Sequence, residues 1–388
     1  MVCNFKKLNI ALISLSYLPK KGGMEYVVHD LATNIKKLGH NVIVFAPRLR
    51  KKEKEIEHNY KLIRFGSKIK GAYASGFNKL YLAYEFMKIH KKTPISVINS
   101  HSAYSSTDYA LFLKRYFSVP VVITCHGHDI QRIPSINYGY RLNKKMNKII
   151  CNNIINADCT ISIGPDVYNE LIDIIPAEKI ISIPNGIHFP SKNDLEKNYL
   201  RNNFGINEGP IIISVGRNHI KKSFDLGLET FKEVLKEIPN ANYVHIGKDS
   251  ESLIALSNEL EIESSFFPIG ELSRDNVFLS YFDSDLFFSP AKAESFGIVT
   301  YEAMYFNLPC VVSDGPGNKD AVVNNKNGYI VKHGDIKEGA SAILKILSND
   351  NLKRDFGKFS EKLVTENFSW NIVSEKYERA FENLSNSF

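Results

Sequence analysis

Short apolar runs alternate with longer amphipathic stretches along almost the whole chain, and this alternation restricts the fold more than any other feature. The runs are rich in Ile and Val, as buried parallel strands are when helices cover both faces of a sheet. In the first half they are residues 8–15, 41–46, 95–99, 119–124, 159–163 and 180–183. Residues 24–38 repeat apolar side chains at helical spacing, and Gly39 follows as a helix stop. This order predicts an α/β protein built on a doubly wound parallel sheet.

The alternation pauses near the middle of the chain and then restarts. A turn cluster, Pro184-Asn185-Gly186, opens a polar stretch that runs to about Gly209. Further strand candidates are residues 211–215, 241–246, 265–269, 285–289, 309–312 and 329–331, and residues 372–384 predict a closing helix. We therefore predict two Rossmann-like domains: residues 1–188, joined by about 370–388, and residues 189–369.

Composition excludes several classes of protein. The chain has 388 residues, of which 44% are hydrophobic and 23% charged, so a disordered or coiled-coil protein is not expected. No apolar run approaches the roughly 20 residues that span a bilayer, and residues 8–18 end without the cleavage site of a signal peptide. We therefore expect a cytoplasmic protein. Five cysteines without a C-x-x-C pair fit neither a disulfide framework nor a zinc module, and three of them lie in apolar surroundings typical of a core.

The formal net charge of +7 conceals two unlike halves. Residues 1–190 contain 27 Lys and Arg against 13 Asp and Glu, whereas residues 191–388 contain 22 against 29. The basic excess is concentrated in residues 48–70, 88–92 and 141–148. An anionic partner of the first half is therefore expected, and nucleic acid, an anionic membrane or a phosphorylated substrate would each fit.

Two strand-to-helix turns carry residues suited to phosphate. Ligands of open parallel sheets bind outside the carboxyl ends of the strands. Gly22-Gly23 precedes the first helix, where close backbone approach and free N–H groups favour an anion; a flexible turn explains the pair equally well. In the second half, Arg217 and Lys222 follow Gly216 on a loop that opens a helix. Two cations at this spacing can converge on a diphosphate, although a solvated basic turn is the alternative.

Two glutamates frame a third turn, with seven residues between them. Glu294 lies just ahead of a predicted helix over residues 296–306, and Glu302 about one and a half turns inside it. Carboxylates accept hydrogen bonds from vicinal hydroxyls, so a ribose and a hexose are natural targets. The backbone N–H groups of Phe296, Gly297 and Ile298 would face the same ligand. Two surface glutamates on an ordinary helix would give the same spacing.

Taken together and in order, these stretches resemble the family 4 glycosyltransferases. The resemblance rests on Gly22-Gly23-Met24-Glu25, His126-Gly127-His128-Asp129, Pro184-Asn185-Gly186, Gly216-Arg217 with Lys222, and the Glu294–Glu302 stretch. It implies the GT-B fold, with two Rossmann-like domains facing a cleft and a C-terminal helix that crosses back onto the N-terminal domain. It also implies an N-terminal domain for the acceptor and a C-terminal domain for the nucleotide sugar.

The resemblance assigns a role to each matching residue. Arg217 and Lys222 would bind the donor diphosphate and stabilise the leaving nucleotide, Glu294 would hold the donor sugar, and Glu302 the ribose. His126 would lie beside the transferred sugar, and Gly22 and Gly23 near the diphosphate and the acceptor. The departures are Ser223 where Gly is usual, the bulky Met304-Tyr305-Phe306-Asn307, and a final motif written Gly315-Pro316-Gly317-Asn318-Lys319-Asp320.

Three further patterns carry less weight. Asp283-Ser284-Asp285 spells a metal-binding D-x-D, but it precedes a strand and is expected to end a helix. Gly315-Pro316-Gly317 lacks the third glycine of a dinucleotide fingerprint and is expected to be a turn. The histidines at positions 101, 126 and 128 show no zinc-like spacing. We therefore expect neither a metal nor another cofactor.

The sequence thus predicts a retaining hexosyltransferase of family 4 type. The expected partners are a nucleoside diphosphate sugar, with UDP favoured, and a hydroxyl acceptor that is a glycan or is lipid-linked. Association with the inner face of an anionic membrane is an open addition, because each basic residue near such a surface contributes about 1 kcal/mol. The alternative is a non-catalytic GT-B-like protein whose basic first half binds membrane or nucleic acid; binding of nucleic acid is not expected.

Overall fold

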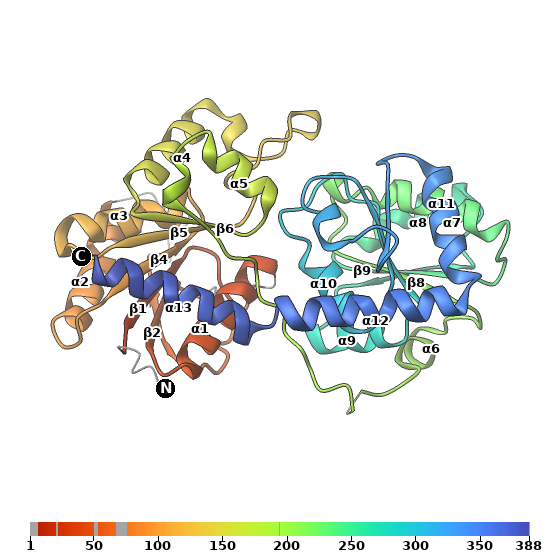
Figure 1. Ribbon diagram of the computed structural model, residues 1–388, viewed down its shortest axis with the longest axis horizontal. Helices are drawn as coiled ribbons and strands as arrows, with labels where there is room; N and C mark the ends of the chain where they lie inside the picture. The colour runs from red at the N-terminus through yellow and green to blue at the C-terminus, as the bar shows by residue number, and fades with distance from the viewer. Residues whose placement is uncertain (1–6, 21, 50–52, 67–75, 194, 388) are drawn as a thin grey trace. The chain divides into compact units, whose positions relative to one another are not determined.

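The computed structural model describes residues 7–20, 22–49, 53–66, 76–193 and 195–387 (Figure 1). The chain divides into two compact units. Unit 1 comprises Met1–Gly186 and Trp370–Phe388, and unit 2 comprises Ile187–Ser369. Among the residues described, no helix is long and apolar enough to cross a membrane. Cys125, Cys159 and Cys310 are buried, as expected, whereas Cys3 lies outside the described residues.

Unit 1 is built on a parallel sheet of seven strands in the order β3-β2-β1-β4-β5-β6-β7. The strands are β1 (Asn9–Ser14), β2 (Asn41–Pro47), β3 (Lys61–Phe65), β4 (Val97–His101), β5 (Val121–Cys125), β6 (Cys159–Ser162) and β7 (Ile180–Ser182). Six of them confirm the predicted runs. The edge strand β3 was missed because Lys61 and Arg64 interrupt its apolar pattern, which is tolerated since an edge strand is only partly covered.

The helices of unit 1 include one from the far end of the chain. They are α1 (Gly23–Lys37), α2 (Gly76–His90), α3 (Ser105–Phe117), α4 (Lys144–Asn156), α5 (Pro165–Ile172) and α13 (Trp370–Asn386), with short 3₁₀ turns η2 (Pro134–Ile136), η3 (Tyr140–Leu142) and η4 (Ala177–Lys179). Helix α13 lies beside α1, so the expected return of the C-terminal helix to the N-terminal domain is confirmed (Figure 1).

A buried hydrogen bond between His40 and Glu378 links α13 to the rest of unit 1. The Leu8 N–H donates to His40 Nδ1 (3.1 Å), so His40 Nε2 carries the proton and donates to Glu378 Oε1 (2.7 Å). His40 is 2% exposed and Glu378 is 5% exposed. Because a buried donor without a partner is costly, this hydrogen bond specifies where α13 lies.

Replacing Glu378 with Ala is expected to lower the free energy of unfolding of unit 1 by about 1–3 kcal/mol, since it leaves the His40 N–H buried and unpaired. Urea unfolding followed by circular dichroism measures this loss. Glu375→Ala, on the exposed face of the same helix, is the matched control and should change the free energy by less than about 0.5 kcal/mol. Equal losses in the two variants would contradict the role of the pair.

Unit 2 is built on a parallel sheet of six strands in the order β10-β9-β8-β11-β12-β13. The strands are β8 (Ile211–Val215), β9 (Asn242–Ile246), β10 (Phe266–Gly270), β11 (Leu286–Ser289), β12 (Cys310–Ser313) and β13 (Gly328–Val331). All six confirm the predicted runs. The helices are α6 (Tyr199–Phe204), α7 (Phe224–Leu235), α8 (Ile254–Glu259), α9 (Arg274–Phe282), α10 (Ile298–Tyr305), α11 (Ile336–Leu347) and α12 (Asp350–Asn367), with 3₁₀ turns η5 (Ile220–Lys222), η6 (Ser250–Leu253) and η7 (Lys319–Ala321).

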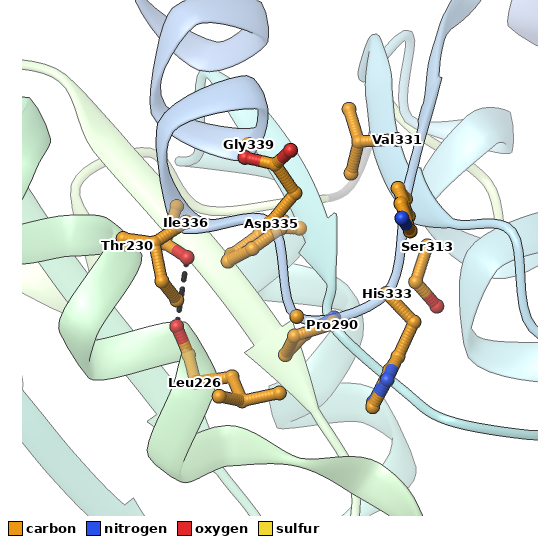
Figure 2. Close-up of a pocket in the computed structure, with 12 residues that line it drawn as sticks. Leu226, Thr230, Pro290, Ser313, Val331, His333, Asp335, Ile336 and Gly339 are labelled. Atoms are coloured by element: carbon orange, nitrogen blue, oxygen red, sulfur yellow. Dashed lines mark hydrogen bonds between the residues drawn. The ribbon is translucent and has the colours of Figure 1, made fainter.

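A small pocket lies between α7 and the start of α11. Figure 2 shows Leu226 and Thr230 of α7 on one side of it, with Pro290, His333 and Asp335 among the other lining residues. Thr230 Oγ1 donates to the Leu226 carbonyl (2.7 Å). None of the predicted site residues lines this pocket, so it belongs to the packing of α7 against α11.

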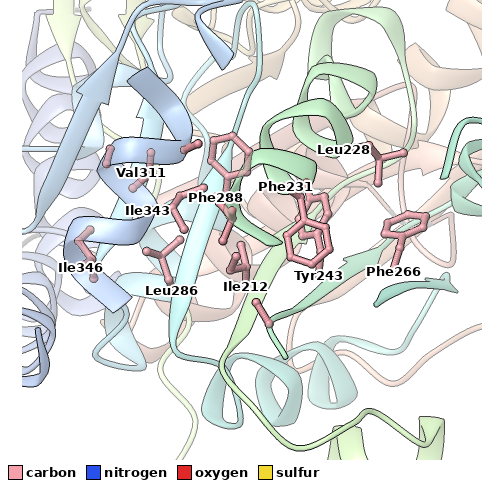
Figure 3. Close-up of a cluster of buried hydrophobic side chains, with 14 of the residues drawn as sticks. Ile212, Leu228, Phe231, Tyr243, Phe266, Leu286, Phe288, Val311, Ile343 and Ile346 are labelled. Atoms are coloured by element: carbon pink, nitrogen blue, oxygen red, sulfur yellow. The ribbon is translucent and has the colours of Figure 1, made fainter. Parts of the chain in front are cut away.

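A large buried cluster of unit 2 lies between one face of its sheet and the helices that cover that face. Buried side chains from the strands pack against those of α7 and α11 (Figure 3); they include Ile212, Leu228, Phe231, Tyr243, Phe266, Leu286, Phe288, Val311, Ile343 and Ile346. The one polar atom of Tyr243 is satisfied, because its hydroxyl hydrogen-bonds Ser214 Oγ (2.8 Å). This packing fixes β8 and β11, whose carboxyl ends carry two of the predicted site segments.

Candidate active site

The loop after β8 places a lysine directly over a glycine. Gly216 has φ of +148°, and a Cβ there would lie 3.3 Å from both Cε and Nζ of Lys222. The Gly216 N–H donates to the Ile246 carbonyl (2.8 Å), and its own carbonyl accepts from His245 Nε2 (2.9 Å). The loop is therefore held to β9 at both backbone atoms, and Lys222 projects over it.

Lys222 also pairs with Glu294, so the structure brings together residues from two distant segments. Lys222 Nζ donates to Glu294 Oε1, and Lys221 Nζ lies 3.7 Å from Oε2. Glu294 is 6% exposed. Burial raises the pKa of the Glu294 carboxyl, but attraction to Lys222 and Lys221 outweighs it and holds the pKa below its ordinary value. Glu294 is therefore an ionised acceptor at neutral pH.

The helix after Glu294 is shorter than predicted. We expected it to begin at Phe296, but α10 begins at Ile298, because Gly297 adopts a left-handed conformation with φ of +75°. The N–H groups of Phe296, Gly297 and Ile298 make no hydrogen bond within the described residues. This helix N-terminus thus offers unpaired donors, the arrangement that binds an anion such as a diphosphate.

Two residues of this segment, Phe296 and Glu302, make side-chain contacts within the protein. The Phe296 side chain is buried and stacks on Tyr301, with ring centroids 4.5 Å apart, so it packs the segment instead of reaching a ligand. Glu302 lies in the second turn of α10, and its Oε1 is 3.6 Å from an Arg274 guanidinium nitrogen at the start of α9. Arg274 is not predicted from the sequence, because nothing along the chain links it to a residue 28 positions later.

Arg217 differs in its surroundings from Lys222, the other predicted cation. It is exposed and makes no hydrogen bond or ion pair with any described residue, whereas Lys222 is held by Glu294. The Ser223 that replaces the usual glycine has φ of +52°, a conformation that glycine adopts at least cost. Its hydroxyl hydrogen-bonds His333 Nε2 (3.1 Å), so the left-handed turn survives the substitution.

The altered motif at Gly315-Pro316-Gly317 forms the turn after β12 and supports the Glu294 segment. The Glu294 N–H donates to the Pro316 carbonyl (2.7 Å). Gly317 has φ of +66°, and a Cβ there would lie 2.2 Å from the Glu294 carbonyl oxygen. Although its sequence departs from the family pattern, the turn at residues 315–317 therefore packs closely against the Glu294 segment.

The D-x-D pattern serves the backbone, as expected for residues that end a helix. Asp283 caps α9 and accepts hydrogen bonds from the N–H groups of Asn198 (2.8 Å) and Leu200 (2.9 Å). Asp285 accepts from the Ile211 N–H (2.9 Å) and pairs with Lys353 (2.9 Å). Across the described residues, no three His, Cys, Asp or Glu side chains are grouped as metal ligands.

In unit 1, Gly22 caps the start of α1. Glu25 of the first turn is buried, accepts a hydrogen bond from Ser16 Oγ and lies 3.4 Å from Lys20 Nζ. A Cβ at Gly22 would lie 2.4 Å from Glu25 Oε2. Glycine at this position therefore leaves room for the carboxylate beneath the loop, and Gly23 follows as the first, exposed residue of the helix.

His126 follows β5 and pairs with His101 at the end of β4. His101 Nδ1 and His126 Nε2 share a hydrogen bond (3.0 Å), and the two rings are stacked. Burial lowers the pKa of His126 to about 4 and that of His101 well below its ordinary value, so both rings are neutral at pH 7. Asp129 accepts from the N–H groups of His126 (3.0 Å) and Ala103 (2.7 Å) and so joins the two loops.

Two doubly wound units, with a lysine–carboxylate pair and open helix donors at the carboxyl edge of one sheet, define a GT-B protein suited to binding a nucleotide. A model described as Glycosyltransferase Family 4 matches residues 21–189, and one described as Glycosyl transferases group 1 matches residues 196–363. The chain belongs to this family of glycosyltransferases.

Similar proteins extend over nearly the whole chain. The N-acetyl-alpha-D-glucosaminyl L-malate synthase of Bacillus anthracis is 22% identical over 95% of this chain and 96% of its own length. The alpha-monoglucosyldiacylglycerol synthase of Streptococcus pneumoniae is 23% identical over 97% of this chain and 83% of its own. The crystal structure of Anabaena Alr3699/HepE in complex with UDP-glucose is 16% identical, with a TM-score of 0.77 over 98% of this chain and 100% of that one. The fold is therefore shared across their length.

Proposed function

We propose that this glycosyltransferase moves a hexosyl group from a nucleoside diphosphate sugar, UDP-sugar favoured, to a hydroxyl acceptor with retention of configuration. The observation that carries the proposal is the pair of Lys222 and Glu294 beside the unpaired N–H groups at the start of α10. A cation and backbone donors suit a diphosphate, and an ionised carboxylate suits sugar hydroxyls. The UDP-glucose complex of the Anabaena protein supports the choice of nucleotide.

In this mechanism the protein stabilises charge as it develops. The bond between the anomeric carbon and the diphosphate oxygen breaks, the acceptor oxygen bonds to that carbon from the same face, and the acceptor proton passes to the leaving diphosphate. Lys222 and the exposed Arg217 neutralise that diphosphate, which is the kind of electrostatic contribution that dominates such reactions. Glu294 holds the sugar hydroxyls, Glu302 the ribose, and the neutral His126 lies beside the transferred sugar. No metal or covalent intermediate is part of the proposal.

A panel of nucleotide sugars tests the reaction directly. The purified protein is incubated with UDP-, GDP- and ADP-linked hexoses, and the released nucleoside diphosphate is measured. Release from one donor, with UDP-sugars expected first, supports the proposal, and the anomeric configuration of the product distinguishes retention from inversion. The absence of release from every donor, in the presence of mixed glycan and glycolipid acceptors, would contradict it.

We also propose that unit 1 reaches a lipid-linked acceptor by lying on an anionic membrane, and a specific surface favours this. On α2, Leu80 and Tyr84 are one turn apart and are 62% and 54% exposed. On the adjacent α3, Tyr116 is 62% exposed and packs on Phe112 at 4.9 Å. Exposed aromatic and aliphatic side chains of this kind sit at a membrane interface.

Basic residues frame this α2–α3 face. Lys88 Nζ lies 5.1 Å from the Tyr84 ring, Lys91 and Lys92 follow the end of α2, and Arg115 is exposed on α3. Within the basic stretch 88–92, Lys88 therefore lies beside an exposed aromatic ring, a combination that favours peripheral attachment. Of the stretch 48–70, residues 50–52 and 67–70 lie outside the described residues. The glycolipid named for the Streptococcus relative is consistent with such an acceptor.

Sedimentation with vesicles tests this attachment. The wild-type protein is expected to bind phosphatidylglycerol vesicles and not phosphatidylcholine vesicles. The triple variant Leu80→Ser, Tyr84→Ser and Tyr116→Ser should lower the bound fraction at least fivefold, because it removes exposed apolar area. Ile254→Ser, a 44% exposed residue of unit 2, is the matched control. Equal recovery of the wild-type protein with both lipids would contradict an electrostatic attachment.

A further inference from the structure

Four aromatic rings gather at the carboxyl edge of the unit 1 sheet. Tyr104 follows β4, His128 follows β5, Tyr138 lies on the loop beyond, and Tyr140 begins η3. The His128 ring is edge-on to Tyr140 at 4.2 Å and to Tyr138 at 4.6 Å, and Tyr104 lies 5.3 Å from Tyr140 between ring centroids. His128 and Tyr140 are exposed, and Tyr104 and Tyr138 are partly exposed. We call these four residues the ring cluster.

The segment that leads into η3 forms a tight hairpin that ends at Tyr138. Ile133 and Tyr138 form an antiparallel bridge, with N–H to carbonyl distances of 2.9 and 3.1 Å. The Tyr140 N–H donates to the His128 carbonyl (3.0 Å), which brings the hairpin back to the end of β5. Gly139 permits this return, because its φ is +112° and a Cβ there would lie 1.9 Å from the Gln131 carbonyl oxygen.

Buried polar side chains form hydrogen bonds that hold the two loops of the ring cluster in place. Asn153 of α4 donates to the carbonyls of Ala103 (3.0 Å) and Tyr104 (2.8 Å). Arg141, only 7% exposed, donates to Glu170 (2.7 Å) and to the Ile130 carbonyl (3.3 Å). Together with the Asp129 contacts described above, these bonds fix both loops, so the rings are held in place before any ligand binds.

We infer that the ring cluster is a carbohydrate-binding platform that stacks a pyranose ring of the acceptor. A pyranose presents C–H bonds on its faces and hydroxyls at its rim, so it fits aromatic faces, which carry negative charge, with polar atoms beside them. Tyrosine and histidine supply both features, whereas a surface for acyl chains would be aliphatic. His128 of the cluster lies two residues after His126, which the proposed function places beside the transferred sugar. The acceptor role rests on the proposed function, but sugar binding itself does not.

Saturation-transfer NMR without any nucleotide tests the platform. The probes are methyl α-D-glucopyranoside and methyl N-acetyl-α-D-glucosaminide. We expect transfer from the wild-type protein to the sugar C–H protons, and a signal at least fivefold weaker for Tyr138→Ala with Tyr140→Ala. The matched variant Tyr138→Phe with Tyr140→Phe keeps both rings and should keep most of the signal. Tyr168→Ala, on α5 and outside the cluster, should leave it unchanged.

Three results would overturn the inference. The first is no transfer to either glycoside from the wild-type protein, and the second is equal signals from the wild-type and double-alanine proteins. The third is stronger transfer to uridine, which would assign the rings to a nucleobase. Donor cleavage is measured on the same proteins with the nucleotide-sugar panel. A failure of that assay would count against the proposed function alone, because sugar binding is observed without nucleotide.

Discussion

Lys222→Ala should lower kcat/KM for donor cleavage by about 10²–10³-fold, because it removes the positive charge that we propose stabilises the leaving diphosphate. Lys222 is held over Gly216 and is hydrogen-bonded to Glu294, whereas Lys221 Nζ lies 3.7 Å from the other carboxylate oxygen. Steady-state release of the nucleoside diphosphate measures the change. Lys236→Ala, which removes an exposed lysine paired with Glu233 on the same unit, is the matched control and should retain full activity.

The partner carboxylate provides an independent check of the same pair. Glu294→Gln keeps the shape of the side chain and removes its charge, and it should also lower kcat/KM by about 10²-fold or more. Because the two side chains touch, the double variant should lose much less than the product of the single losses. Full additivity, or single variants with nearly wild-type activity, would show that the pair is not part of the active site.

Gly317→Ala should lower kcat/KM by about 30–100-fold even though Gly317 is not proposed to touch a substrate, because displacements of about 1 Å are that costly in an active site. The added Cβ would lie 2.2 Å from the Glu294 carbonyl oxygen, so the Glu294 segment must shift. The measurement is donor cleavage, accompanied by a thermal melt to confirm folding.

Gly334→Ala is the matched control for this substitution. Gly334 also has positive φ, +85°, but a Cβ there would meet no atom within 4 Å. Both variants bear the left-handed strain of about 1–2 kcal/mol, and only Gly317→Ala displaces Glu294. Similar activity in the two variants would show that the turn does not position the carboxylate.

Most strands could be predicted from the sequence, because parallel strands covered on both faces are short unbroken apolar runs. The exception, β3, lies at the sheet edge, where Lys61 and Arg64 reach solvent or polar partners. The start of α10 was predicted two residues early, since periodicity does not register the left-handed backbone of Gly297. Local patterns thus identified elements well and their boundaries less well.

The candidate site was only partly predictable. The glycines and charged residues of the turns were found because the order of strands places them at one edge of each sheet. The contacts between them depend on tertiary packing, so the sequence indicated neither the pairing of Arg274 with Glu302 nor the burial of Phe296. The ring cluster was missed for the same reason, since its residues come from two loops that only the fold joins.

The return of α13 to unit 1 has a consequence for the order in which the protein assembles. Unit 2 is encoded entirely between two parts of unit 1, and Trp370 packs where a side chain on Gly186 would otherwise stand. During synthesis unit 2 therefore has all of its residues before unit 1 does. Until α13 has been synthesised, α1 lacks the helix that packs against its apolar face. The His40 N–H likewise lacks its hydrogen-bond acceptor, Glu378. The helix that completes unit 1 is thus made only after the whole of unit 2.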